Sequence, residues 1–141
     1  MADILVDSNV LLDVLTDDPV WFDWSADMLE RCAEDHLLTI NPMIYAEISV
    51  GFARIEELEA ALAEAGLARR EIPWEAAFLA GKCFLRYRRH GGDRRSPLPD
   101  FFIGAHAAVA GMSLLTRDDS RYRSYFPTLT LIAPKHRPRH A

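Results

Sequence analysis

The sequence has few of the residues that build disulfide scaffolds or zinc sites. It contains only two cysteines, Cys32 and Cys83, which form no Cys-x-x-Cys pair and lie in segments with helical patterns. We expect them to be reduced core thiols of a cytoplasmic protein. No group of His and Cys residues has the spacing of zinc ligands, so a zinc site is not expected.

Long apolar runs and a leader pattern are also missing. No apolar run approaches the roughly 18 residues that a membrane span needs. The N-terminus, Met1-Ala2-Asp3, lacks the positive and apolar regions of a signal peptide. We therefore expect a cytoplasmic protein that makes no membrane contact.

Basic residues are scarce in the first half of the chain. Residues 1–66 hold fifteen Asp and Glu but only Arg31 and Arg54 as cations, whereas residues 67–141 hold fourteen Lys and Arg against six acids. This asymmetry favours either a polyanionic partner for the basic half or two solvated faces of opposite charge.

The remaining pattern predicts one α/β domain. Half of the 141 residues are hydrophobic, enough for a core. Short apolar runs at residues 3–7, 36–41, 112–119 and 128–134 alternate with helical patterns at residues 10–15, 19–33, 42 onward, 56–66, 74–92 and 99–111. We predict a three-layer α/β/α sandwich with a central, mostly parallel sheet of four or five strands. It spans residues 1–134, and the basic segment 135–141 is expected to be a loose tail.

Four carboxylates are predicted to meet at one edge of this sheet, because ligands of such folds bind beyond the carboxyl ends of the strands. Asp7 follows the first strand, and Asp118 follows the strand at residues 113–115. Asp100 lies in the first turn of the helix that begins near Pro99, and Glu47 points from an apolar helix face. Taken singly, Asp7 is also a possible helix cap, Asp100 a first-turn charge, Asp118 a turn residue and Glu47 a partner for an arginine.

The four carboxylates are more informative together than singly. Carboxylates that lie close together repel and raise one another's pKa values, and a divalent cation relieves that repulsion. Oxygen ligands suit Mg²⁺ or Mn²⁺. The sequence therefore predicts a metal site made of Asp7, Glu47, Asp100 and Asp118.

These pieces resemble a known family. The segments "ILVDSNVLLD", "NPMIYAEI", "LPDFFIGAHA" and "LLTRDDSRYRSYFPTLTLI" span nearly the whole chain and resemble the PIN domain, in particular the VapC-type toxins of type II toxin–antitoxin pairs. The resemblance implies that Asp7, Glu47, Asp100 and Asp118 form the catalytic metal site, with Asn9 and Thr116 as polar supports. Asp119 is adjacent to Asp118, and the Thr-x-Asp arrangement of the family favours Asp118 for the site.

The resemblance implies an endoribonuclease that depends on Mg²⁺ or Mn²⁺. Such an enzyme hydrolyses RNA phosphodiester bonds with a metal-activated water and inhibits translation or growth. The products carry 5′-phosphate and 3′-hydroxyl ends. Attack by the RNA 2′-hydroxyl usually needs paired acid and base groups such as histidines, and the five histidines show no evident pairing.

Partners follow from the charges and from the resemblance. The basic residues beside the proposed site are RNA-contact candidates that bind phosphates: Lys82, Arg86, Arg89, Arg94, Arg95 and Arg117. The RNA implied by the family is transfer or ribosomal RNA. The family also implies a VapB-type antitoxin that places a cation near the acidic site, and a homodimer. The aromatic stretch Trp21, Phe22 and Trp24 either lines one of these contacts or packs in the core.

Other functions stay open at this point. The same residues suit a PIN ribonuclease of RNA processing or decay without an antitoxin, or a non-catalytic PIN-fold binding module. A phosphatase of the haloacid-dehalogenase type is disfavoured because Asn9 replaces its second aspartate and no clear downstream Ser/Thr and Lys motifs follow.

Overall fold

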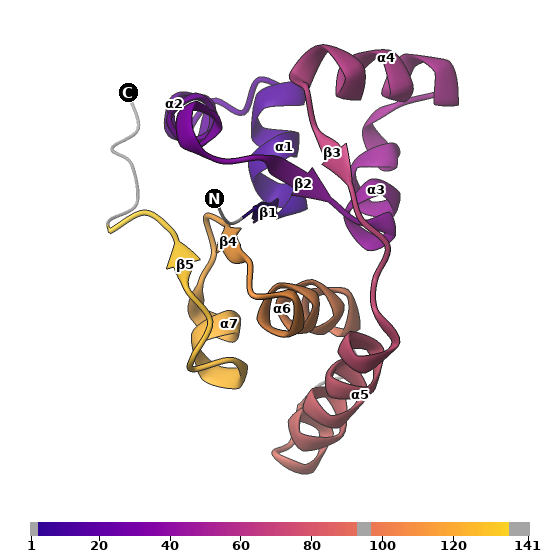
Figure 1. The fold of residues 1–141 in the computed structure, drawn as a ribbon, viewed down its shortest axis with the longest axis vertical. Coiled ribbons are helices and arrows are strands. Elements are labelled where there is room, and N and C mark those ends of the chain that lie inside the picture. The colour runs from indigo at the N-terminus through magenta and orange to yellow at the C-terminus, as the bar shows by residue number, and fades with distance from the viewer. Residues whose placement is uncertain (1–2, 93–96, 136–141) are drawn as a thin grey trace.

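Short strands and helices alternate along the chain in the computed structural model, which describes residues 3–92 and 97–135 (Figure 1). The strands are β1 (Ile4–Val6), β2 (Leu38–Ile40), β3 (Ala68–Arg69), β4 (Ser113–Leu115) and β5 (Leu131–Ile132). The helices are α1 (Ser8–Leu15), α2 (Phe22–Asp35), α3 (Pro42–Ile48), the 3₁₀ helix η1 (Ser49–Gly51), α4 (Ile55–Ala65), α5 (Trp74–Arg89), α6 (Leu98–Ala110) and α7 (Ser120–Tyr125). The RNA-contact candidates Arg94 and Arg95, and the predicted tail after Lys135, lie outside the described residues.

The five strands form one sheet in the order β3-β2-β1-β4-β5, and every pairing is parallel. Strand β1 lies at the centre, with Ile4 in register with Leu38 on one side and Ser113 on the other. All three residues of β1 are buried, as both faces of a parallel sheet require. The predicted three-layer α/β/α architecture is confirmed.

The helices cover the two faces of this sheet. Helices α1 and α2 contact each other and lie on one side, whereas α6 and α7 contact each other on the other side (Figure 1). Helix α3 contacts both α1 and α6, so it lies beside the edge where β1 ends. Within the described residues, no helix has the length and apolar character that crossing a bilayer requires.

Several boundaries lie where the sequence signals indicate. Helix α3 begins after Asn41, whose Oδ1 accepts the Ile44 N–H at 2.9 Å, and Pro42 occupies its first turn. The Asn41 side-chain amide also pairs with His106 Nδ1 at 3.0 Å, which ties α3 to α6. Helix α6 ends at Gly111, which adopts the left-handed conformation with φ of 69°.

Two elements were not predicted. Strand β3 has only two residues, Ala68 and Arg69, too few for an alternating pattern. Helix α7 has six residues in the segment "SRYRSY", where polar and aromatic residues hide any apolar stripe. Helix α1 also begins at Ser8, earlier than the predicted start near Val10.

Candidate active site

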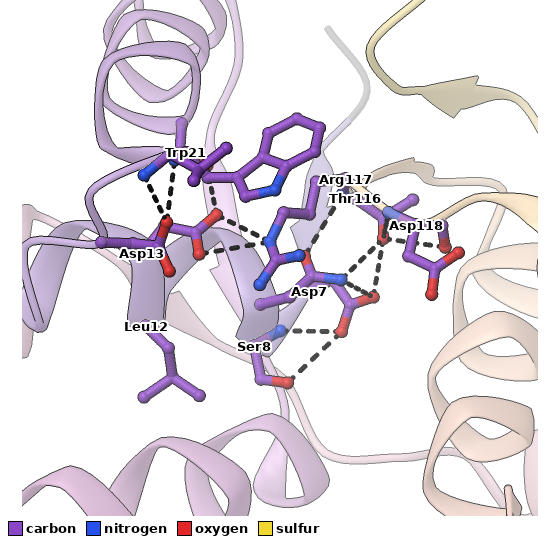
Figure 2. A network of polar contacts seen from close by, with 12 residues as sticks. Asp7, Ser8, Leu12, Asp13, Trp21, Thr116, Arg117 and Asp118 are labelled. Atoms are coloured by element: carbon purple, nitrogen blue, oxygen red, sulfur yellow. Dashed lines mark hydrogen bonds and ion pairs between the residues drawn. The ribbon is translucent and has the colours of Figure 1, made fainter. Parts of the chain in front are cut away.

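Asp7 is the most enclosed carboxylate at the end of β1. It is only 3% exposed, and it is the N-cap of α1 because its Oδ1 accepts the Ser8 N–H at 2.8 Å. Its Oδ2 accepts hydrogen bonds from Thr116 Oγ1 and Tyr122 OH, each at 2.9 Å. Figure 2 shows the contacts of Asp7 with Ser8 and Thr116. The side chain is therefore held by neutral donors from α1, the loop after β4, and α7.

Burial has the largest effect on the pKa of Asp7. It raises the pKa of this carboxyl group to about 6, although the hydrogen bonds from Thr116 and Tyr122 act in the opposite direction. The negative charges of Asp100 and Glu47 raise the pKa further. Three carboxylates thus share one electrostatic environment at this edge.

Glu47 lies on α3 and is linked to Asp7 through one hydroxyl group. Ser8 Oγ lies 2.9 Å from Glu47 Oε1 and 3.4 Å from Asp7 Oδ1. Burial raises the pKa of Glu47, the hydrogen bond from Ser8 lowers it, and the charge of Asp100 raises it. Of the alternatives for Glu47, the arginine partner does not occur among the described ion pairs.

Asp100 occupies the first turn of α6 and has a cationic partner. Its Oδ2 lies 2.7 Å from Arg121 Nη1 of α7. The pair is half-exposed, with 34% of the Asp100 side chain and 40% of the Arg121 side chain accessible. Asp100 therefore reaches the cluster from the side that faces solvent.

Asp118 lies at the rim of this cluster. Its side chain is exposed and accepts a 3.3 Å hydrogen bond from Ser120 Oγ, and its N–H donates to Thr116 Oγ1 at 3.2 Å. The neighbouring Asp119 forms an ion pair with Arg123. The carboxylates whose charges act on Asp7 are Asp100 and Glu47.

Asn9 and Thr116 lie directly beside Asp7. Asn9 Nδ2 donates to Thr116 Oγ1 at 3.2 Å and lies 3.5 Å from Asp7 Oδ2. Asn9 Oδ1 accepts the Arg117 N–H at 3.3 Å, which joins α1 to the loop after β4. The two polar residues therefore link the ends of β1 and β4.

The donor set can be compared with the needs of a divalent cation. Among residues 3–92 and 97–135, no three His, Cys, Asp or Glu side chains stand close enough as a group to hold a metal ion. The available donors are carboxylate and hydroxyl oxygens, which suit Mg²⁺ or Mn²⁺. Burial raises the pKa values of Asp7 and Glu47, and the negative charge of Asp100 raises both further. The chemistry of the residues thus fits a hard cation, provided that Asp100 turns from Arg121 toward the cluster.

The predicted RNA contacts lie in two settings. On α5, Arg89 is exposed, Lys82 lies 5.1 Å from the centre of the Phe78 ring, and Arg86 lies 4.7 Å from that of Tyr125. Arg117 instead reaches away from the carboxylate cluster: its Nε lies 2.9 Å from the buried Asp13 Oδ2 (Figure 2).

Arg117 is part of a network that joins α1 and α2. Asp13 also accepts a 2.7 Å hydrogen bond from Ser25 Oγ, and the Arg117 guanidinium lies 5.3 Å from the centre of the Trp21 ring. Trp21 is buried and packs edge-on against Trp24 with ring centres 5.8 Å apart. These aromatics belong to the packing around the Arg117–Asp13 pair.

Sequence reasoning missed Tyr122 as a partner of Asp7 and Arg121 as the partner of Asp100. Both reside on α7, whose short segment carries no helical pattern in the sequence. The one sequence feature that could have indicated these contacts is the positive charge of Arg121, three residues after Asp118. The Ser8 hydroxyl was also not predicted to take part in the site, and it donates a hydrogen bond to Glu47.

Comparisons with known proteins agree with this architecture. The family model described as PIN domain matches residues 4–126. No curated protein sequence matches the chain significantly.

Solved structures share the fold at low sequence identity. VapBC2 from Rickettsia felis, bound to a promoter DNA fragment, is 19% identical with a TM-score of 0.71, covering 94% of this chain and 98% of that chain. FitAcB from Neisseria gonorrhoeae is 18% identical with a TM-score of 0.66, over 94% and 99% of the two chains. VapC20 from Mycobacterium tuberculosis, described as a toxin that cleaves the sarcin-ricin loop, is 11% identical with a TM-score of 0.62, over 86% and 95%.

Proposed function

The chain belongs to the PIN domain family, and from that membership we propose that it is an endoribonuclease that depends on Mg²⁺ or Mn²⁺ and acts as the toxin of a toxin–antitoxin pair. The observation that carries this proposal is the pairing of Asp7 with Glu47 through the Ser8 hydroxyl at the end of the central strand, where the charge of Asp100 acts on both carboxylates. Buried carboxylates with raised pKa values are typical of catalytic sites.

Each residue has a proposed role in this reaction. Asp7 and Asp100 hold the divalent cation, and Glu47 and Asp118 complete the site or orient the attacking water. Asn9 and Thr116 fix the Asp7 carboxylate through the contacts described above. When bound, the cation supplies positive charge at the scissile phosphate and lowers the pKa of the attacking water.

The partners are a VapB-type antitoxin, RNA and a second copy of the chain. Structures of similar fold contain VapBC complexes, which supports the antitoxin. The exposed cations of α5 support phosphate binding. Trp74 and Phe78 at the start of α5 are 89% and 69% exposed, and an exposed aromatic pair of this kind supports a homodimer contact.

The test uses purified protein and total bacterial RNA. We expect cleavage with Mg²⁺ or Mn²⁺ that leaves 5′-phosphate ends, and at least about a hundredfold loss of rate in Asp7→Asn and Asp100→Asn. Asp27→Asn, in an exposed ion pair with Arg31 on α2, is the matched control and retains full activity. Full activity in Asp7→Asn or Asp100→Asn would contradict the role of that residue.

Expression in bacteria separates the toxin from a processing enzyme. The wild-type chain is expected to arrest growth, and co-expression of an antitoxin encoded by a neighbouring gene restores it. Growth at the normal rate with active enzyme present would favour RNA processing or decay.

A further inference from the structure

Helix α7 reaches the acidic cluster with two consecutive side chains. The Tyr122 hydroxyl donates a hydrogen bond to Asp7 Oδ2, and Arg121 Nη1 lies 2.7 Å from Asp100 Oδ2. The first contact is buried and has a neutral donor, the Tyr122 hydroxyl. The second is half-exposed and has a charged donor, the Arg121 guanidinium. The two residues therefore act on the cluster in different ways.

Arg121 is the cation of this cluster within the described part of the chain. The ion pairs among residues 3–92 and 97–135 include one with Asp100, and none with Asp7 or Glu47. Those two carboxylates are bound by hydroxyl and amide donors instead. Arg121 thus offsets negative charge at the same carboxylate that the proposed metal site needs.

We propose that Arg121 competes with the divalent cation for Asp100 and thereby sets the metal concentration at which the site fills. This inference rests on the proposed function, because it concerns the same site. The cation and the guanidinium both require the Asp100 carboxylate, so one displaces the other. A free acidic cluster would bind the metal more tightly than a cluster that already holds an arginine.

The surroundings of Arg121 suit such an exchange. An ion pair that is half-exposed contributes little to stability, so its loss does not unfold the helix. The guanidinium also lies 5.9 Å from the centre of the Tyr87 ring on α5, a cation–π contact that does not involve Asp100.

The first experiment measures Mn²⁺ binding by calorimetry to the full-length protein without RNA. Arg121→Gln is expected to bind Mn²⁺ at least about fivefold more tightly than wild type, since it removes the positive charge that is paired with Asp100. Arg123→Gln is the matched control, because Arg123 lies on the same helix and pairs with Asp119 instead. Its Mn²⁺ affinity is expected to equal that of wild type.

A second measurement distinguishes displacement from repulsion at a distance. In wild-type protein, the guanidinium NMR signals of Arg121 are expected to shift when Mg²⁺ is added, as the contact with Asp100 breaks. Asp100→Asn, which removes the charge of the shared ligand, is expected to bind Mn²⁺ at least about tenfold more weakly than wild type.

The outcomes separate this inference from the proposed function. Unchanged or weaker Mn²⁺ binding in Arg121→Gln, or Arg121 signals that do not respond to Mg²⁺, overturns the competition while the metal site stands. Wild-type protein that binds no Mn²⁺, or Asp100→Asn that binds it as well as wild type, overturns both.

Discussion

Asp7 combines two roles that the sequence alone presents as alternatives. It caps α1 through the Ser8 N–H, and it is also the buried member of the carboxylate cluster. The two roles are compatible because a carboxylate has two oxygens. Oδ1 faces the helix, and Oδ2 faces Thr116 and Tyr122.

The raised pKa of Asp7 predicts how the stability of the metal-free protein depends on pH. Between about pH 4 and pH 6 the folded state binds a proton at Asp7 that the unfolded state has released. Asp7 therefore destabilises the fold above its pKa of about 6, and the fold recovers stability as the pH falls toward 4. The difference amounts to about 3 kcal/mol.

Comparison with Asp7→Asn isolates this effect. In EDTA, the free energy of unfolding of the variant relative to wild type is expected to increase by up to about 3 kcal/mol from pH 4 to pH 8. Urea denaturation at several pH values measures it. A difference that stays constant with pH would show that burial does not act on the charge of Asp7.

The Arg117–Asp13 pair gives a prediction about stability. The Asp13 side chain is only 2% exposed, so Arg117→Met would leave a buried carboxylate without its cation. We expect a loss of about 2 to 4 kcal/mol in the free energy of unfolding. Adding Asp13→Asn should recover part of the loss, which a double-mutant cycle in urea measures. If Arg117→Met lowered the free energy of unfolding equally in the wild-type and Asp13→Asn backgrounds, the two residues would not be coupled.

At the level of single residues, the sequence indicated carboxylates but not their partners. Asp7 follows a strand end and Asp100 lies at a helix start, both of which the sequence pattern locates, and Glu47 lies on the helix that Asn41-Pro42 begins. The pairing of Arg117 with Asp13 depends on how α1, α2 and the loop after β4 pack together. That packing joins residues 104 positions apart, and periodicity does not record it.

Among the elements, α6 depends on one glycine. A Cβ atom added to Gly104 would lie 2.4 Å from Cε2 of the buried Phe126 ring. Gly104→Ala is therefore expected to lower the free energy of unfolding by about 1 to 3 kcal/mol, because the ring must move.

Gly81 in α5 provides the matched control. No atom lies within 4 Å of an added Cβ there. Gly81→Ala should raise the free energy of unfolding by about 0.5 to 1 kcal/mol, through the better helix propensity of alanine. Urea denaturation of both variants checks the pair, and a stabilising Gly104→Ala would contradict the contact with Phe126.

The elements that the sequence predicted well are those with strong end signals. Asn41-Pro42 marks the start of α3, and Gly66 and Gly111 mark the ends of α4 and α6. Strand β3 and helix α7 lack such signals, and both form because neighbouring elements provide their partners. Strand β3 pairs with β2, and the aromatic side chains of α7 pack against α6.

For the whole molecule, the uneven charge predicts the salt dependence of RNA binding. The exposed Lys82 and Arg89 lie on α5, and α2 lies at the opposite end of the molecule (Figure 1). Replacing Lys82 and Arg89 by Gln is expected to reduce the slope of the logarithm of the RNA association constant against the logarithm of salt concentration by about 1.4. Each phosphate contact of single-stranded RNA contributes about 0.7 to this slope.

Fluorescence anisotropy with a labelled RNA in EDTA, over a range of KCl concentrations, measures this slope. Arg31→Gln on α2 is the control and should leave it unchanged. An equal slope for wild type and the Lys82/Arg89 double variant would exclude α5 as the RNA surface.

The order of the sheet has a consequence for the synthesis of the protein. Strand β1 emerges first from the ribosome, yet its partner β4 and the donors Thr116 and Tyr122 follow more than 100 residues later. A nascent chain therefore carries Asp7 without the two donors that hold its Oδ2, until translation has passed α7. By this topology, the proposed nuclease has no assembled carboxylate cluster until α7 has been translated.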